Sequence, residues 1–80
     1  MAVEGWTEKD GFLNKEYKLK DFEAALAFVN KVGKIAEEMD HHPDICIHSY
    51  NRVNLKTKTH SEGKITEKDF KLAEKVNQIQ

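Results

Sequence analysis

The sequence predicts an α+β domain: a four-stranded antiparallel sheet with helices packed on one face, in the order β-β-α-β-β-α. Two observations carry this prediction. Two pairs of extended segments alternate apolar and polar residues, and each pair is followed by apolar residues at helical spacings of three and four. The 80 residues contain no repeat, low-complexity run or linker, so we expect one domain over residues 1–80.

The first pair of strands is predicted within residues 3–19. Asp10-Gly11 divides this segment, and this dipeptide favours the positive φ angles of a tight hairpin turn. The residues on either side alternate imperfectly between apolar and polar. We therefore expect two short strands joined at Asp10-Gly11.

A helix is predicted over residues 21–40. Asp21 is a suitable N-cap, and an apolar stripe follows it to about Met39. Gly33 is unfavourable inside a helix, so we expect it to allow a close approach to the sheet. Pro43 disfavours the helical region for the residue before it, so the helix is expected to end near Asp40–His41.

The second pair of strands is predicted at residues 44–50 and 52–60. We place the turn between them at Asn51-Arg52 and expect Tyr50 to pack on the sheet as a turn aromatic. After a loop at 62–64, a last helix is predicted over residues 66–80. Thr66 and Asp69, three residues apart, form a near capping box at its start.

Composition limits the classes of partner. The chain has 13 basic and 14 acidic residues with the signs well mixed, which argues against binding to nucleic acid or to a membrane surface. It has no apolar run long enough to cross a bilayer. Cys46 is the only cysteine, so no intrachain disulfide can form, and a reducing cytoplasmic location is expected.

Three histidines are the candidates for chemistry. His41 and His42 stand directly before the only proline, Pro43, and His60 stands at the end of the last predicted strand. Histidine can both give and take a proton near neutral pH. Helix ends and strand ends meet at the rim of a two-layer domain, so the three imidazoles could converge on one cleft without a metal.

Less specific interpretations remain open. Any single histidine in a small domain is usually a surface residue, and we assign His48 to that class. His41, His42, His60 and Cys46 include zinc-ligand types, but adjacent histidines rarely bind one ion and no paired-ligand spacing supports them. Cys46 lies within an apolar strand, which disfavours a nucleophilic role. Glu37, one helical turn before His41, could orient it or lie on the surface.

The spacing of these residues is similar to that of a known family. Glu37, His41-His42-Pro43, Tyr50, His60 and Asp69 are separated by three, six, nine and eight residues. This pattern resembles the signature of the pterin-4a-carbinolamine dehydratases. Gly5-Trp6, the Asp10-Gly11 turn and the segment 36–44 also resemble that family, so the resemblance covers roughly residues 5–78.

The resemblance implies a hydro-lyase. Its substrate would be a 4a-hydroxytetrahydropterin, dehydrated to a quinonoid dihydropterin during pterin cofactor recycling, with no metal or other cofactor. The expected catalytic residues are then His41, His42 and His60. The expected substrate-binding residues are His42, Glu37 and Asp40. The remaining motif positions, Pro43, Tyr50 and Asp69, are expected to be structural. For Asp69 the favoured role is helix capping.

Two alternatives to this function stay open. Some family members act as dimerisation cofactors of a transcription factor through a helix surface, and others could act on a different pterin, for instance in molybdopterin metabolism. The resemblance also implies a homodimer or homotetramer, with sheets joined edge to edge. Exposed sheet edges make such pairing physically reasonable.

Overall fold

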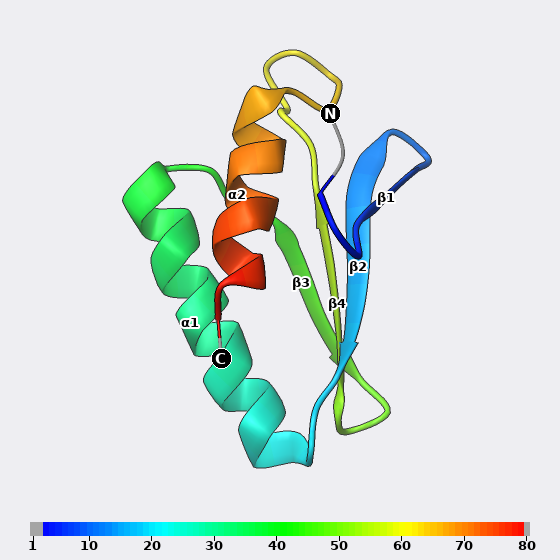
Figure 1. Cartoon of the computed structure of the whole chain (residues 1–80), viewed down its shortest axis with the longest axis vertical. Coiled ribbons are helices and arrows are strands. Elements are labelled where there is room, and N and C mark those ends of the chain that lie inside the picture. Colours follow the sequence, from blue (N-terminus) through cyan, green and yellow to red (C-terminus); the bar gives the residue numbers. More distant parts are fainter. Residues whose placement is uncertain (1–2, 80) are drawn as a thin grey trace.

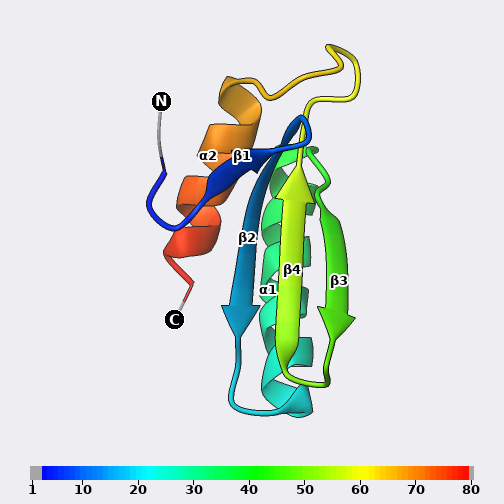
Figure 2. The ribbon, with the colours of Figure 1, turned by 90° about the vertical axis from the view of Figure 1, so that its right-hand side faces the viewer.

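Two helices lie on one face of a four-stranded antiparallel sheet in the computed structural model, which describes residues 3–79 (Figures 1 and 2). The α+β class and the predicted order are confirmed. The elements in chain order are β1 (Thr7–Lys9), β2 (Phe12–Lys18), α1 (Phe22–Met39), β3 (Asp44–His48), β4 (Arg52–Thr57) and α2 (Glu67–Asn77). The spatial order of the strands is β1-β2-β4-β3, so β1 and β3 are the two edges.

The sheet and helices share one apolar core. In β4 the residues Val53, Leu55 and Thr57 are buried and their neighbours are not, as the alternation predicted. They pack beneath the inner faces of both helices. The buried apolar residues of the helices are Ala25, Phe28, Val32, Ala36, Leu72, Ala73 and Val76. None of the helices within residues 3–79 is long and apolar enough to cross a membrane.

The ends of α1 follow local sequence signals. The Asp21 side chain accepts a hydrogen bond from the Ala24 N–H at 2.8 Å, which confirms it as the N-cap. Asp40 has left-handed backbone angles (φ 52°), and the N–H of His41 bonds to the Ala36 carbonyl at 3.0 Å. The helix therefore ends where Pro43 predicted, and its last turn sets the direction in which the chain leaves. The last helix, predicted to residue 80, ends earlier, at Asn77, and Gln80 lies outside the described residues.

The two hairpin turns differ in how well they were predicted. Asp10 and Gly11 have φ angles of 54° and 80°, as expected for a tight turn. In the second hairpin the left-handed residues are Ser49 and Tyr50, with φ angles of 50° and 53°, so the predicted turn at Asn51-Arg52 is wrong.

Long-range hydrogen bonds explain the displaced turn. Asn51 is buried and bound to Leu19: the Leu19 N–H donates to the Asn51 carbonyl at 2.7 Å, and the Asn51 side-chain amide donates to the Leu19 carbonyl at 3.1 Å. Arg52 already belongs to β4, opposite His48. Tyr50 is 64% exposed, so the prediction that it packs on the sheet is also wrong.

The side chain of Asn77 makes several hydrogen bonds that join the N-terminal segment to α2, and the sequence did not predict them. The Asn77 side-chain oxygen Oδ1 accepts from Trp6 Nε1–H at 3.0 Å and from Lys15 Nζ at 3.1 Å. The Asn77 side-chain Nδ2 donates to the Glu4 backbone carbonyl at 3.0 Å. These bonds hold the first described residues against the end of the last helix.

Gly33 does not approach the sheet. A Cβ built on it would have nothing within 4 Å, so the predicted close approach is wrong. The helical position carries the entropic cost of glycine without a packing reason.

Replacing Gly33 by alanine should therefore stabilise the chain. We expect Gly33→Ala to raise the free energy of unfolding by about 0.5–1 kcal/mol in urea titrations. Gly63→Ala is the control: its Cβ would also meet open space, but its φ of +68° is left-handed, so this variant should be less stable than the parent. If Gly33→Ala were less stable than the parent, the added Cβ could not be meeting open space at position 33.

Candidate active site

The segments that carry the predicted site residues lie at one end of the molecule. The α1–β3 connection (residues 40–43) and the β4–α2 loop (residues 58–66) are both at the top in Figures 1 and 2. The β3–β4 turn, which carries Tyr50, lies at the opposite end. The end of α1, which leads to His41 and His42, and the end of β4, which leads to His60, therefore lie at the same end of the molecule, as expected. Within one protomer, Tyr50 is separated from both segments.

A buried carboxylate connects these two segments. Asp69 is fully buried, and its two oxygens accept four hydrogen bonds. Oδ1 accepts from the Thr57 hydroxyl and from His41 Nε2, each at 2.6 Å. Oδ2 accepts from the Thr59 hydroxyl at 3.0 Å and from the Thr66 N–H at 2.8 Å. The capping role predicted for Asp69 is present, and its contact with His41 is additional to it.

The proton positions in this network follow from the donors available. The Thr59 hydroxyl has one proton and gives it to Asp69, so the Thr66 hydroxyl, 2.6 Å away, must be the donor to Thr59. An ionised carboxylate only accepts, so His41 Nε2 must carry a proton. In neutral His41 the other ring nitrogen, Nδ1, is then a free acceptor. Asp69 thus fixes both the tautomer and the orientation of the His41 ring.

The same contacts keep Asp69 charged. Burial alone would raise the pKa of this carboxyl group, but hydrogen bonds from Thr57, His41, the Thr66 N–H and Thr59 outweigh it. The pKa of Asp69 therefore lies below its ordinary value. At neutral pH a buried negative charge stands behind the largely buried His41 ring.

The second histidine has a different partner. His42 Nε2 contacts Glu37 Oε2, and both side chains are more than half exposed. Glu37 therefore contacts His42 and not His41, and its side chain lies on the surface, which was the second of the two interpretations left open by the sequence. Asp40, which lies between Glu37 and His42 in the chain, is exposed and is the C-cap of α1.

His60 is close in sequence to the network, but its ring is not held by it. It is exposed and follows Thr59, whose hydroxyl binds Asp69. Among residues 3–79, no side chain hydrogen-bonds to the His60 ring. A hollow of about 270 Å³ borders this loop and the start of α2, lined by Thr59, Ser61, Glu62, Thr66, Glu67 and Lys68.

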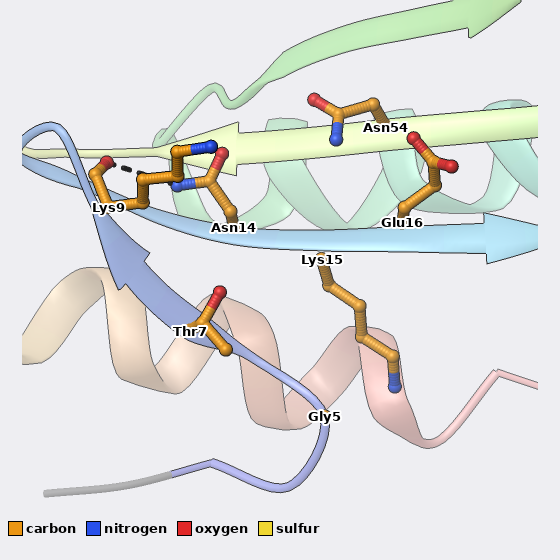
Figure 3. Close-up of a pocket in the computed structure, with 7 residues that line it drawn as sticks. All are labelled: Gly5, Thr7, Lys9, Asn14, Lys15, Glu16 and Asn54. Carbon is orange, nitrogen blue, oxygen red and sulfur yellow. Dashed lines mark hydrogen bonds between the residues drawn. The ribbon is translucent and has the colours of Figure 1, made fainter.

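A second hollow of similar volume, about 270 Å³, lies elsewhere and contains no histidine (Figure 3). Asn14, Glu16 and Asn54 line it from the open face of the sheet, away from both helices. His48 lies on that face and bonds to Glu16 at 2.9 Å, in keeping with the surface role we assigned to it. Within residues 3–79, no group of three or more histidine, cysteine, aspartate or glutamate side chains could hold a metal ion.

The Asp69 network should make stability depend on pH. Because the folded chain lowers the pKa of Asp69, the carboxylate stabilises the fold above its unfolded pKa of about 4, and this contribution is lost as the pH falls through the folded value. We expect Asp69→Asn to cost about 1–3 kcal/mol at pH 7, measured by urea unfolding. The difference from the parent should shrink below pH 4.

Glu74→Gln is the matched control for that measurement, since Glu74 is an exposed carboxylate on α2. It should change the free energy of unfolding little at either pH. A deficit in Asp69→Asn that stays constant from pH 7 to pH 3 would contradict a charged Asp69.

The match to known proteins covers nearly the whole chain. A family model described as pterin 4 alpha carbinolamine dehydratase matches residues 1–79. Similar proteins from several organisms carry the name "Putative pterin-4-alpha-carbinolamine dehydratase". The one from Sulfolobus acidocaldarius is 54% identical over 78 residues, covering 98% of this chain and 85% of the relative. The one from Thermomicrobium roseum is 47% identical over 79 residues, covering 99% and 84%.

Solved structures share the fold. A transcriptional coactivator/pterin dehydratase from Brucella melitensis is 39% identical with a TM-score of 0.85, over 94% of this chain and 81% of that one. A pterin dehydratase-like protein described as a RuBisCO assembly factor has a TM-score of 0.70 at 20% identity, over 90% and 82%, and shows the fold alone. With its fold, its histidine segments and this match over residues 1–79, the chain belongs to the pterin-4a-carbinolamine dehydratase family.

Proposed function

We propose that this chain dehydrates a 4a-hydroxytetrahydropterin to the quinonoid dihydropterin by histidine acid–base catalysis, as a single domain that needs no cofactor. The observation that supports this most directly is the contact between His41 and the buried Asp69 carboxylate at 2.6 Å. It fixes one ring nitrogen as a donor to the protein and leaves the other for the substrate. Family membership supplies the pterin as the class of substrate.

The reaction needs two proton transfers and no change in oxidation state. A base removes the proton from N5 of the pterin, and an acid protonates the 4a hydroxyl group, which leaves as water. The electrons of the N5–H bond form the N5=C4a double bond, and those of the C4a–O bond leave with the oxygen. Two imidazoles of opposite protonation state supply both groups near neutral pH.

The residues have distinct expected roles in this proposal. His41 and His60 exchange the protons, one as acid and one as base. His42, oriented by Glu37, and Asp40 at the same bend bind the pterin. Asp69 is a positioning residue that acts through His41. We further propose that the chain works as a homodimer or homotetramer in the cytoplasm, where it contributes to pterin cofactor recycling.

A binding function is the second candidate. The Brucella melitensis relative of known structure is described as a transcriptional coactivator as well as a pterin dehydratase. On α1 of the present chain, Phe22 and Leu26 are 49% and 43% exposed, which gives a helix surface on which a protein could bind. Such a function would not need the histidines, so activity and binding can be separated by mutation.

Removing either proposed acid–base group should slow dehydration without unfolding the chain. We expect His41→Ala and His60→Ala each to lower kcat by about 10²- to 10⁴-fold with a synthetic 4a-hydroxytetrahydropterin, followed by ultraviolet absorbance. His48→Gln is the control, because it changes an exposed histidine on the open face and keeps a group that can bond to Glu16. Equal activity in all four proteins would remove the enzyme hypothesis.

The role of Asp69 can be separated from its effect on stability. If it acts through His41, Asp69→Asn should lower kcat in the parent and change it little when His41→Ala is already present. Thr57→Val is the matched control, since it removes another donor to the same oxygen but touches no histidine. It should weaken folding more than it weakens kcat. Equal kcat losses from Asp69→Asn in both backgrounds would show that Asp69 does not work through His41.

A further inference from the structure

Strand β2 is longer than the strand that covers its outer side. β1 pairs with β2 only at residues 12–14, whereas β2 continues to Lys18. Within residues 3–79, no strand pairs with the second half of β2 on that side. Figure 2 shows β1 beside the upper part of β2, while no strand lies beside its lower part. The sheet therefore has an open stretch of edge along a strand that is otherwise enclosed.

Hydrogen bonds identify the backbone groups that point outward from this stretch. The Leu19 N–H donates to the Asn51 carbonyl at 2.7 Å, which continues the β2–β4 register. Since hydrogen-bonded pairs alternate along an antiparallel ladder, Tyr17 directs its backbone groups to β4, whereas Glu16 and Lys18 direct theirs outward. Within residues 3–79, no backbone group bonds to the outward N–H and C=O of Glu16 or Lys18. These groups are therefore available to an added strand.

A hollow with apolar walls borders the same stretch, on the side of the sheet that carries the helices. Its volume is about 370 Å³, larger than the two hollows described above. The rings of Tyr17 and Phe28 both line it, with centroids 4.6 Å apart. Apart from Lys31, all the residues that line it are aromatic or aliphatic: Tyr17, Leu19, Ala24, Ala27, Phe28 and Ile79. The hollow can therefore take an apolar side chain that approaches along the edge of β2.

An added strand reaches both the open edge and the hollow. In a strand antiparallel to β2, the residues opposite Glu16 and Lys18 bond to the outward backbone groups and direct their side chains to the open face. The residue between them, opposite Tyr17, directs its side chain to the helix side, where the hollow lies. Figure 3 shows this alternation in β2, with Glu16 on the open face and Lys15 on the helix side. Main-chain bonds of this kind give affinity, and a pocket for alternate side chains gives specificity.

The charges along this edge decide which kind of strand fits. Lys18 and Lys20 are exposed, and within residues 3–79 neither makes a salt bridge. Glu16 is the one acidic residue among residues 15–20, and it is already bonded to a histidine of β3 and an arginine of β4. A second copy of this chain, paired through the same stretch, would set lysines against lysines. An acidic segment has the complementary charge.

We propose that the second half of β2 is a docking site for an extended acidic segment of another protein, which adds to the sheet antiparallel to β2. The segment places an acidic residue opposite Lys18, then an aliphatic residue opposite Tyr17 in the hollow, then a small polar residue opposite Glu16. The end of β2 and the start of α1 lie at the bottom in Figures 1 and 2, opposite the histidine segments. The proposal is therefore independent of the proposed function.

Selective methylation of a peptide backbone tests the register. The probe is a labelled peptide with the sequence Ser-Val-Glu-Leu-Thr-Ser and blocked ends, titrated with the whole chain by fluorescence anisotropy. We expect saturable binding, and N-methylation of its glutamate or threonine should weaken it about tenfold, because each loses an N–H that bonds to β2. N-methylation of the leucine is the matched control, since that N–H points away from β2. No binding of the parent peptide, or equal effects of the three methylations, would overturn the proposal.

Filling the hollow tests the place of the apolar side chain. Ala27 is exposed on α1 and lines the hollow, so Ala27→Leu should fold normally and weaken binding of the peptide about tenfold by occupying its space. Ala27→Ser keeps the space and should bind the peptide nearly as well as the parent. Because the histidines lie at the other end, His41→Ala should bind it like the parent. Unchanged affinity in Ala27→Leu would remove the hollow from the docking site.

Reversal of one charge tests the acidic character of the segment. Lys18→Glu should weaken binding of the acidic peptide about fivefold and should strengthen binding of a peptide with lysine in place of glutamate. Lys34→Glu is the control, because it makes the same charge change at an exposed position of α1 that does not line the hollow. Equal effects of the two variants would show that the charge opposite position 18 does not select the segment.

Hydrogen exchange measured residue by residue locates the peptide on the chain. In the free chain the amides of Glu16 and Lys18 should exchange quickly and that of Tyr17 slowly, because only Tyr17 faces β4. The peptide should slow the first two at least about tenfold. It should leave the sedimentation of the chain unchanged apart from its own mass. A peptide that separated copies of the chain would show that a second copy occupies this edge, and the proposal would fall.

Discussion

The buried negative charge of Asp69 is the constraint on which the rest of this structure depends. A carboxylate without solvent is costly unless each oxygen is hydrogen-bonded. Here Thr57 of β4 and Thr59 just after it provide two hydroxyl groups, the N-cap of α2 provides an N–H, and the connection that follows α1 provides an imidazole. Three elements that meet at one end of the molecule are therefore held by one group, and none of them can move away without leaving part of that charge unsatisfied.

This arrangement couples folding to the orientation of the His41 ring. A domain of 80 residues buries a modest share of its surface, so its stability is small and each satisfied buried group matters. The bond that orients His41 is one of the four that compensate the charge of Asp69. The orientation of this ring is therefore tied to the compensation of a buried charge. His60, by contrast, is exposed, and no side chain within residues 3–79 hydrogen-bonds to its ring.

Local signals allowed most of the fold to be predicted, and long-range contacts explain what was missed. Asp21, the Asp10-Gly11 turn and Pro43 act on their immediate neighbours, and each was interpreted correctly from the sequence. The contact of Asp69 with His41 spans 28 residues, and that of Trp6 with Asn77 spans 71. The turn at Ser49–Tyr50 could not be placed from the sequence for the same reason, since the bonds of Asn51 to Leu19, 32 residues away, decide it. Only the family spacing connected His41 and Asp69 before their geometry was known.

The topology also links the site to the edge of the sheet. The chain leaves α1 at Asp40, passes the two histidines and Pro43, and enters β3 directly, and β3 is an outer strand. A helix exit that led to a central strand would be enclosed by its own protomer. Asp69 holds one side of the histidine segment through His41, and the segment continues directly into an edge strand. An unprotected sheet edge has a physical reason to be covered, so the histidine segment adjoins the part of the sheet where an additional strand could pair.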